Sequence, residues 1–130
     1  MRVHSALGNG FQEVIYQRAL AIELKFSEIP FLREFEMPIF YRERHIGTRR
    51  VDFLVQDVLS VELKAVTKLE DAHFSQAINY LEAYHLEVGL LINFGERSLN
   101  FKRLKNKKIK QENIILLDGE NNEETKDKSL

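Results

Sequence analysis

Three charged side chains in two short apolar segments are the first candidates for chemistry. Asp52 lies within residues 51–55, Glu62 and Lys64 lie within residues 61–65, and both segments have the β-branched and aromatic character of strands. Because side chains alternate between the two faces of a strand, we expect Glu62 and Lys64 to point away from the apolar residues beside them. For Asp52 the same rule predicts a face opposite to the alternate apolar residues of its segment, Val51, Phe53 and Val55.

The three residues between the two segments determine how the segments pair. If residues 56–58 form a hairpin loop, Val55 lies opposite Leu59, and Asp52 lies directly opposite Glu62 on one face of the sheet. Two carboxylates in this position repel each other, and the repulsion grows when water is partly excluded. The arrangement therefore predicts a bridging cation. Because the chain has no cysteine, a hard ion such as Mg²⁺ or Mn²⁺ is expected.

A divalent cation held in this way suits the cleavage of a phosphodiester bond. Such an ion polarises a phosphoryl oxygen, makes a water molecule more acidic and shields developing negative charge. The ammonium of Lys64 would stand beside the ion and orient the attacking water or neutralise the transition state. The alternative is structural, because a salt bridge between Lys64 and Glu62 or Asp52 would leave the same short pattern in the sequence.

Two helical segments supply further polar candidates. Glu13 lies at helical spacing from Tyr16 and Leu20, so we expect this carboxylate to face inward at the shoulder of an apolar stripe. Gln76 lies in line with Tyr80 on a second helix and is expected to face the sheet. For the glutamine a packing role at the edge of the core is the alternative, and the four histidines are interpreted as surface or packing residues.

Periodicity places these candidates on two helices. Residues 11–27 carry apolar side chains at helical spacing, and Pro30 marks the end of that helix. The apolar positions in question are Phe11, Ile15, Ile22 and Phe26. Residues 71–86 predict a second amphipathic helix, and residues 1–7 are interpreted as the last turns of an earlier one.

The remaining segments predict strands. Residues 31–66 have the composition of three adjacent antiparallel strands, with one turn at residues 44–47 and another in the loop described above. An unbroken apolar run at residues 88–94 predicts a strand covered on both faces, and shorter strands are expected at residues 99–104 and 114–117. This order of elements predicts an α/β fold with a mixed β-sheet flanked by α-helices.

Basic residues are concentrated in two clusters. Residues 118–130 hold five acidic residues against two lysines, so the remaining 117 residues have a net charge of +2. One basic cluster leads directly into Asp52, and the other lies at residues 102–110. The first cluster comprises Arg42, Arg44, Arg49 and Arg50. Such clusters suit a polyanionic partner, and we expect the four arginines to contact a phosphate backbone, although solvated surface charge is the alternative interpretation.

Length and composition limit the class of protein. With 130 residues, 44% of them hydrophobic and 30% charged, the chain has the size of one folded soluble domain. We assign residues 1–117 to that domain and interpret residues 118–130 as a disordered acidic tail. No stretch approaches the roughly 20 apolar residues that a membrane span requires, so a cytoplasmic protein without a membrane partner is expected.

Four separated motifs follow one another along the chain. They are GFQEVIY at residues 10–16, RVD and VELKA within residues 50–65, QAINYL at residues 76–81, and VGLLINFG at residues 88–95. In this order they resemble the GxxExxY proteins, a branch of the PD-(D/E)xK nuclease superfamily. The resemblance extends from about residue 3 to residue 104.

The resemblance implies a restriction-endonuclease-like core and a role for each residue of the strand motifs. Asp52 and Glu62 would be metal ligands, together with the main-chain carbonyl of Leu63. Lys64 would be the catalytic lysine. One departure from the superfamily pattern is Val51, which stands before Asp52 where the family name has a proline.

The helical motifs gain roles from the same resemblance. Glu13 would be the helix-borne carboxylate that assists the metal and takes part in catalysis. Gln76 with Tyr80 resembles the Gln-x-x-x-Tyr element of RecB-like members, which implies a catalytic role for the glutamine and a nucleic-acid contact for the tyrosine.

Three functions are compatible with the sequence. The first is a nuclease that depends on Mg²⁺ or Mn²⁺ and hydrolyses phosphodiester bonds in DNA, with RNA as the second choice of substrate. The second is a non-catalytic nucleic-acid-binding module that retains the nuclease fold, and the third is a small interaction protein. The complete Asp, Glu and Lys set favours the first, because a binding module has no need for carboxylates that repel phosphate. A homodimer is left open.

Overall fold

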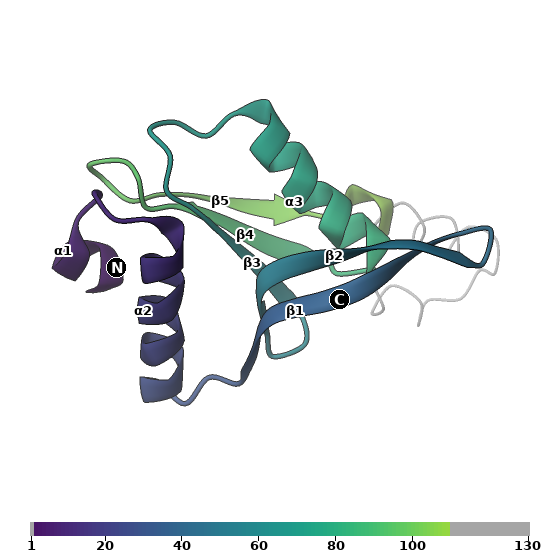
Figure 1. Cartoon of the computed structure of the whole chain (residues 1–130), viewed down its shortest axis with the longest axis horizontal. Coiled ribbons are helices and arrows are strands. Elements are labelled where there is room, and N and C mark those ends of the chain that lie inside the picture. Colours follow the sequence, from purple (N-terminus) through teal and green to yellow (C-terminus); the bar gives the residue numbers. More distant parts are fainter. Residues whose placement is uncertain (1, 110–130) are drawn as a thin grey trace, which may run out of the picture.

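The structure, a computed structural model, describes residues 2–109 and consists of one mixed β-sheet with helices on both faces (Figure 1). The elements in chain order are α1 (Arg2–Leu7), α2 (Glu13–Phe26), β1 (Phe31–Tyr41), β2 (Arg44–Val55), β3 (Leu59–Lys64), α3 (Asp71–Ala83), β4 (Val88–Asn93) and β5 (Asn100–Lys105). This agrees with the element order expected from periodicity. The strand expected at residues 114–117 and the tail at residues 118–130 lie outside the described residues.

The five strands lie in the order β1-β2-β3-β4-β5. All neighbours are antiparallel except β3 and β4, which are parallel and are connected through α3. Such a parallel connection needs a crossover, and α3 supplies it by packing on the opposite face of the sheet from α2. The predicted α/β fold with a mixed sheet between helices is confirmed. None of the described helices has the length and apolar character needed to cross a bilayer.

Helix α2 buries a different stripe from the one that its most apolar positions suggested. Tyr16, Gln17, Leu20 and Ala21 are buried. Of the stripe expected to be buried, Ile22 is 67% exposed and Phe26 is 80% exposed. The prediction was wrong because the buried set includes a polar residue and a tyrosine, which a purely apolar count overlooks.

The buried stripe of α2 forms the larger of two hydrophobic clusters. There Tyr16 and Leu20 pack with residues of the central strands and of β4. The strand and loop residues in this cluster are Phe53, Val55, Val61, Leu63, Ile92 and Phe94. The smaller cluster, on the α3 side, contains Val51, Leu54 and Tyr80.

Val51 was expected to share a face with Phe53 and Val55, and this was wrong. Instead it packs with Leu54 in the cluster on the α3 side. The reason lies in an irregularity of β1, where the ladder with β2 skips Glu34 and Asp52.

 The φ angle of Glu34 is 51°, in the left-handed region that a non-glycine residue adopts only when its surroundings hold it there. A strand irregularity of this kind changes the local twist, so strict alternation fails at this point.

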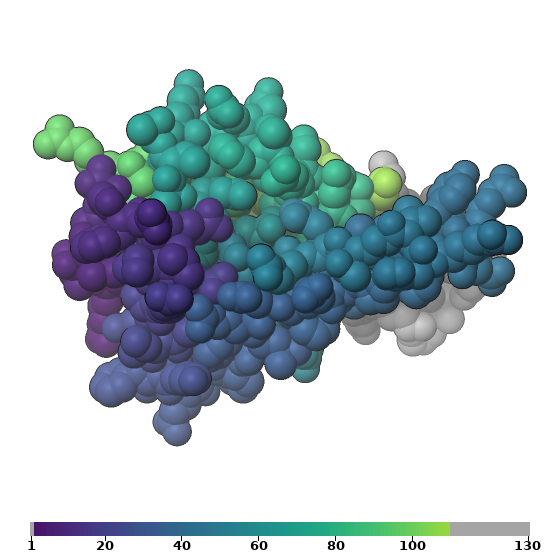
Figure 2. All heavy atoms as spheres, viewed as in Figure 1, coloured from purple at the N-terminus to yellow at the C-terminus, as the bar shows by residue number. Residues whose placement is uncertain are grey.

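The β1–β2 hairpin extends beyond the helices. The hydroxyl of Tyr84, directly after α3, donates to the main-chain oxygens of Met37 and Pro38 in β1. We call residues 39–47 the arm, and Figure 2 shows this part of the hairpin projecting from the body. The turn was predicted at residues 44–47 but occurs at Arg42 and Glu43, which both have positive φ angles, as a two-residue hairpin turn of the primed type requires.

Candidate functional site

The pairing of β2 with β3 ends just before the two carboxylates. The ladder runs from Val55 opposite Leu59, as predicted, to Phe53 opposite Val61. The next pair in this register would be Asp52 and Glu62, but the ladder does not include it. Instead the carboxylate of Asp52 accepts a hydrogen bond of 2.7 Å from the main-chain N–H of Leu63.

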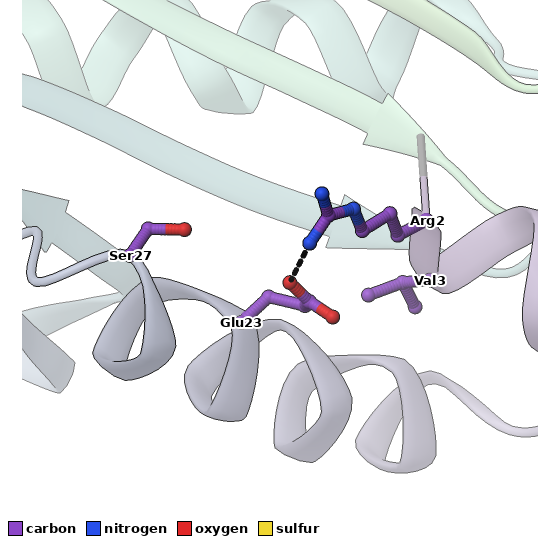
Figure 3. A pocket seen from close by; sticks show the side chains of 4 residues that line it. All are labelled: Arg2, Val3, Glu23 and Ser27. Atoms are coloured by element: carbon purple, nitrogen blue, oxygen red, sulfur yellow. Dashed lines mark ion pairs between the residues drawn. The ribbon is translucent and has the colours of Figure 1, made fainter.

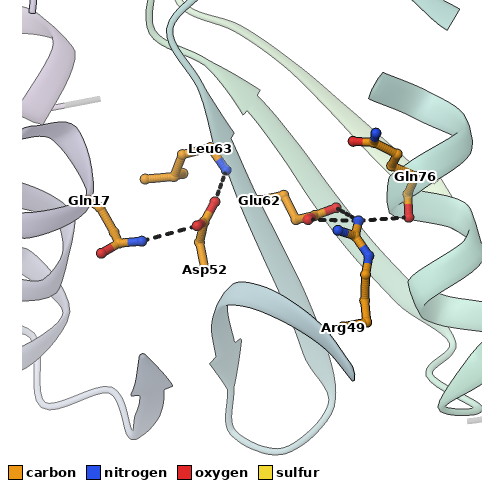
Figure 4. Close-up of polar contacts among 6 residues, drawn as sticks. All are labelled: Gln17, Arg49, Asp52, Glu62, Leu63 and Gln76. Atoms are coloured by element: carbon orange, nitrogen blue, oxygen red, sulfur yellow. Dashed lines mark hydrogen bonds and ion pairs between the residues drawn. The ribbon is translucent and has the colours of Figure 1, made fainter. Parts of the chain in front are cut away.

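The two carboxylates turn toward different helices. Figure 4 shows Asp52 on the side of α2 and Glu62 on the side of α3. The expectation that they lie face to face on one side of the sheet was therefore wrong. The physical reason is that two like charges side by side are unfavourable, whereas at the open end of the ladder each carboxylate reaches its own hydrogen-bond donors.

Asp52 is held by a polar chain that reaches from α2 to β1. Gln17 donates from Nε2 to Oδ1 of Asp52 at 3.0 Å and accepts at Oε1 from Nε of Arg33 at 2.9 Å. Gln17 is buried, so its amide has no alternative partners in water. Sequence reasoning missed this residue. The available signal was its position four residues after Glu13, which places both on one side of the helix.

Glu62 is held by an arginine from β2. Nη2 of Arg49 lies 3.2 Å from Oε1 and 3.5 Å from Oε2 of Glu62, and it also donates to the main-chain oxygen of Gln76 at 3.2 Å (Figure 4). The carboxylate of Glu62 is largely buried, so this guanidinium offsets part of the cost of removing it from water.

Glu13, Asp52 and Glu62 form a cluster of negative charge with Lys64 beside it. Burial raises the pKa of Glu62, the nearby Arg49 lowers it, and repulsion from Asp52 raises it further. Loss of hydration also raises the pKa of Glu13, again with repulsion from Asp52, while Lys64 lowers the pKa of both glutamates. The proposed site residues therefore lie close enough for their charges to act on one another.

The position of Glu13 differs in one respect from the expectation. It is the first residue of α2 and its side chain is exposed, rather than turned inward along the apolar stripe. A carboxylate in the first turn of a helix is stabilised by the exposed N–H groups and the positive end of the helix dipole. The charges of Asp52 and Lys64 act on the pKa of Glu13, so this carboxylate lies near the open end of the β2–β3 ladder.

Tyr16 anchors the loop that leads into α2. Its hydroxyl donates to the main-chain oxygen of Gly8 at 2.6 Å and accepts from the N–H of Phe11 at 3.1 Å. Its ring is fully buried and stacks on Phe94 with the ring centres 4.6 Å apart. The glycine lies in the left-handed region, with a φ of 75°, which favours glycine at this turn. These bonds to Gly8 and Phe11 hold the loop just before the helix begins.

We expect Tyr16→Phe to lower the free energy of unfolding by about 1–3 kcal/mol, because the partly buried N–H of Phe11 and carbonyl of Gly8 each lose a partner. Urea denaturation followed by circular dichroism measures the change. Tyr41→Phe, which removes the same hydroxyl from an exposed residue of the arm, is the matched control. Equal stability of the two variants would contradict this account.

The end of β3 is fastened to β4 next to Lys64. The main-chain N–H of Phe94 donates to the carbonyl of Lys64 at 2.7 Å. The fully buried Asn93 binds both the N–H and the carbonyl of Val66. Gly95 has no room for a side chain, since a Cβ there would lie 2.3 Å from the main-chain oxygen of Val66. These contacts hold the backbone on which Lys64 stands.

The main-chain carbonyl of Leu63 is directed to the open side of β3. In a strand the carbonyls alternate between the two neighbouring strands, and that of Lys64 points to β4. The carbonyl of Leu63 consequently turns the other way, toward β2, where the ladder has ended. It is thus available beside Asp52, as its expected role as a metal ligand requires.

The residues of α3 do not take the positions expected of them. Gln76 is exposed, and in the described structure only its main-chain oxygen is bonded to a site residue, namely Arg49. Tyr80 is 1% exposed, so its expected contact with nucleic acid was wrong: the ring belongs to the core, where burial of its apolar surface is favourable. His73 has a structural role, because Nδ1 accepts from the N–H of Glu70 at the start of the helix.

The four arginines of the first basic cluster are separated. Arg42 and Arg44 lie at the exposed tip of the arm. Arg49 binds Glu62, as described, and Arg50 lies 3.5 Å from Glu34 of β1. Only Arg49 reaches the carboxylate cluster, because neighbouring residues of a strand point to opposite faces.

The carboxylate cluster lies between β2, β3 and the start of α2. The cavity between α1 and α2 drawn in Figure 3, with a volume of about 240 Å³, is lined by Arg2, Val3, Glu23 and Ser27 and contains none of the proposed site residues. Within residues 2–109, no three His, Asp or Glu side chains form a ready-made metal cage.

The residues present nevertheless suit a hard divalent cation. The charge of Asp52 raises the pKa of Glu62, an effect that a positive ion would relieve, and the carbonyl of Leu63 adds a neutral oxygen. Mg²⁺ is commonly held by one or two carboxylates, with water and substrate oxygens completing its shell. The donor set is therefore of the right chemical kind for such an ion.

The raised carboxylate pKa values predict an unusual dependence of stability on pH. A glutamate whose pKa is raised in the folded state binds protons there more readily than in the unfolded chain, so stability falls as the pH rises above the ordinary value of 4.5. For the metal-free protein we expect the free energy of unfolding to fall more steeply, as the pH rises above 4.5, than for Glu62→Gln. Glu43→Gln in the arm is the control, and equal slopes for all three proteins would contradict the prediction.

Comparison with known proteins completes the description of the site. Residues 1–104 match a family model described as the PD-(D/E)XK nuclease superfamily. The fold is similar to the crystal structure of SSO0001, with a TM-score of 0.58, 18% sequence identity, and coverage of 72% of this chain and 50% of that one. No curated protein matches the sequence significantly. Because the family match spans most of the chain and includes both strand motifs, the chain belongs to the PD-(D/E)XK nuclease superfamily.

Proposed function

We propose that this protein is a nuclease that depends on Mg²⁺ or Mn²⁺ and hydrolyses phosphodiester bonds, with DNA ahead of RNA as substrate. The observation that supports this most strongly is the gathering of Asp52, Glu62 and Lys64 where the β2–β3 ladder opens, with Glu13 near them at the start of α2. A salt bridge built only for stability would not need three carboxylates gathered at one place, where their negative charges are unfavourable to one another.

Each residue of the cluster has a distinct part in the proposed reaction. Asp52, Glu62 and the carbonyl of Leu63 would hold the ion, and Glu13 would assist from α2. When bound, the ion polarises a phosphoryl oxygen and shields the negative charge that develops during hydrolysis. Lys64 stands beside the carboxylates on the fastened end of β3, where its ammonium neutralises charge on the phosphate and orients the attacking water.

The experiment that tests this function is a cleavage assay with the purified full chain. Linear and circular DNA, single-stranded DNA and RNA are incubated with Mg²⁺ or Mn²⁺, and parallel samples contain excess chelator. We expect cleavage of at least one substrate with the metal and none with the chelator. Cleavage that persists in excess chelator would overturn the proposal.

The exposed arm supports a second candidate function, a nucleic-acid-binding module without catalysis. Arg42 and Arg44 lie there beside the exposed Phe40 and Tyr41, a combination of cations and aromatic rings that suits a phosphate backbone and unstacked bases. In a nuclease the same surface would position the substrate. The two functions differ in whether any substrate is cleaved, so the cleavage assay separates them.

We expect the double variant Arg42→Gln and Arg44→Gln to weaken nucleic-acid binding and to make its salt dependence shallower. Each lost phosphate contact should reduce the slope of log affinity against log salt by about one. Fluorescence anisotropy with a labelled oligonucleotide over a range of salt concentrations measures this slope. Arg18→Gln, at an exposed position of α2, is the control, and an unchanged slope in the double variant would rule out phosphate contacts by the arm.

We also propose that the chain belongs to the GxxExxY branch of the superfamily, because the tyrosine of the motif, Tyr16, holds the loop that leads into α2. We also propose a catalytic role for Gln76, whose main-chain oxygen binds Arg49 beside the cluster. The single domain over residues 1–117, the cytoplasmic location and the homodimer remain predictions from the sequence.

A further inference from the structure

Arg49 neutralises Glu62 in the place where a cation would do so. Its guanidinium contacts both oxygens of a carboxylate whose residue is only 8% exposed. A carboxylate this buried needs a compensating charge. In the described part of the chain, Arg49 forms the salt bridge that provides it.

The geometry of this pair is poor for a permanent structural ion pair. All three contacts of Arg49 come from one nitrogen, Nη2, whereas a strong arginine–carboxylate pair uses two parallel hydrogen bonds. The distances of 3.2 and 3.5 Å exceed the roughly 2.7–2.9 Å of a good charge-assisted hydrogen bond. The arginine side chain also keeps 30% exposure to solvent. A weak, partly exposed pair can be exchanged at low cost.

A neighbouring hydroxyl shows that the polar groups here are not fully satisfied. The buried hydroxyl of Tyr80 has no hydrogen-bond partner in the described structure. The charges of Glu62 and Arg49 both act on it, so it lies near the pair. A buried donor without a partner is unfavourable and rare in native proteins. A rearrangement of Arg49, Glu62 and Tyr80 could thus form hydrogen bonds that the observed arrangement lacks.

We propose that Arg49 and the divalent cation exchange at Glu62, and that the released guanidinium binds a phosphate of the substrate. This inference rests on the proposed function, whose metal site it uses. Without metal, Arg49 is bound to Glu62 and Gln76 and is withheld from phosphate. With metal at Glu62, the positive charge of Arg49 has lost its partner and lies beside the ion. Arg49 is then a positioning residue that couples metal binding to substrate binding.

The proposal predicts a reciprocal effect on the two ligands. An internal cation that competes for Glu62 weakens metal binding, so its removal should strengthen it. The same removal should reduce the gain in nucleic-acid affinity that the metal brings, because no guanidinium is released toward phosphate. A merely structural salt bridge would produce neither effect, since breaking it would only lower stability.

The first experiment measures Mn²⁺ binding to the metal-free protein by isothermal titration calorimetry, without nucleic acid. We expect Arg49→Gln to bind Mn²⁺ about fivefold or more tightly than the wild type. Arg49→Lys, which keeps a positive charge, should stay close to the wild type. Arg50→Gln removes the same charge one position away, where the partner is Glu34, and should also leave Mn²⁺ affinity unchanged. Equal affinities of Arg49→Gln and Arg50→Gln would overturn the exchange.

The second experiment measures binding of a labelled DNA oligonucleotide with and without Ca²⁺, an ion that binds oxygen ligands. Ca²⁺ should strengthen DNA binding more in the wild type than in Arg49→Gln, and an equal gain in both would overturn the exchange. The variant Glu62→Gln distinguishes failure of the exchange from failure of the proposed function. If it binds Mn²⁺ as well as the wild type, the metal site of the proposed function fails. If only Glu62→Gln changes Mn²⁺ affinity, the function stands and the exchange fails.

Discussion

Asp52→Asn is expected to reduce metal-dependent cleavage by about 100- to 1000-fold, the usual effect of removing one group that stabilises developing charge. The carboxylate of Asp52 has three roles. It accepts a hydrogen bond from the N–H of Leu63, it accepts another from Gln17, and it supplies negative charge to the proposed ion. The amide keeps one acceptor oxygen for Leu63 but loses the charge. Single-turnover cleavage at saturating substrate measures the loss, and Mn²⁺ binding should weaken in parallel.

Asp57→Asn is the matched control for this variant. Asp57 lies in the β2–β3 loop at a positive φ angle, which asparagine also tolerates, and the loop closes the β2–β3 ladder at the end opposite to the one where the cluster lies. We expect this variant to cleave at the wild-type rate. Thermal unfolding of both variants shows whether the fold is retained. If folded Asp52→Asn cleaves within a few-fold of the wild type, Asp52 is not part of the catalytic site.

Lys64→Met should lower the cleavage rate by about 100-fold or more while leaving metal binding intact. Methionine keeps an unbranched apolar stem of similar length, so the packing at the end of β3 is preserved. In the wild type this ammonium lowers the pKa of both Glu13 and Glu62. Without it, less of the negative charge of the carboxylates is compensated, so they still favour a bound cation. Cleavage and Mn²⁺ affinity therefore respond differently, unlike in Asp52→Asn, where both fall.

Lys68→Met, in the exposed segment between β3 and α3, provides the comparison for Lys64→Met. It removes the same charge from the same region of the chain without touching the cluster. A rate loss of equal size in both variants would point to a general effect of charge on nucleic-acid binding, and would remove Lys64 from the proposed mechanism. A loss of Mn²⁺ binding in Lys64→Met would contradict the separation of roles.

The elements could be predicted well because their signals are local. Apolar spacing identified both long helices, and strand composition identified the strands, with ends within a few residues of those observed. The loop at residues 56–58 also gave the correct register for Val55 and Leu59. The turn of the arm was misplaced, because either Arg42 and Glu43 or the following glycine could have formed it and only the first pair adopts positive φ angles.

The partners of the site residues could not be predicted in the same way. Gln17 and Asp52 are 35 positions apart, and Arg49 and Glu62 are 13 positions apart on strands whose facing sides change at an irregularity. Strict alternation gave the wrong face for Val51 for the same reason. The sequence of one strand does not predict where the neighbouring strand bends, so these contacts depend on the assembled sheet.

The sequence by itself determined which residues could do chemistry: an aspartate and a Glu-x-Lys on adjacent strands, and a glutamate at the start of a helix. Only the tertiary structure decided how they are arranged. It ended the β2–β3 ladder at the carboxylates, turned Asp52 to Gln17 and Glu62 to Arg49, and buried Tyr80. The physical reason is that residue type and periodicity act over a few positions, whereas charge compensation and burial depend on distances between segments that meet only in the fold.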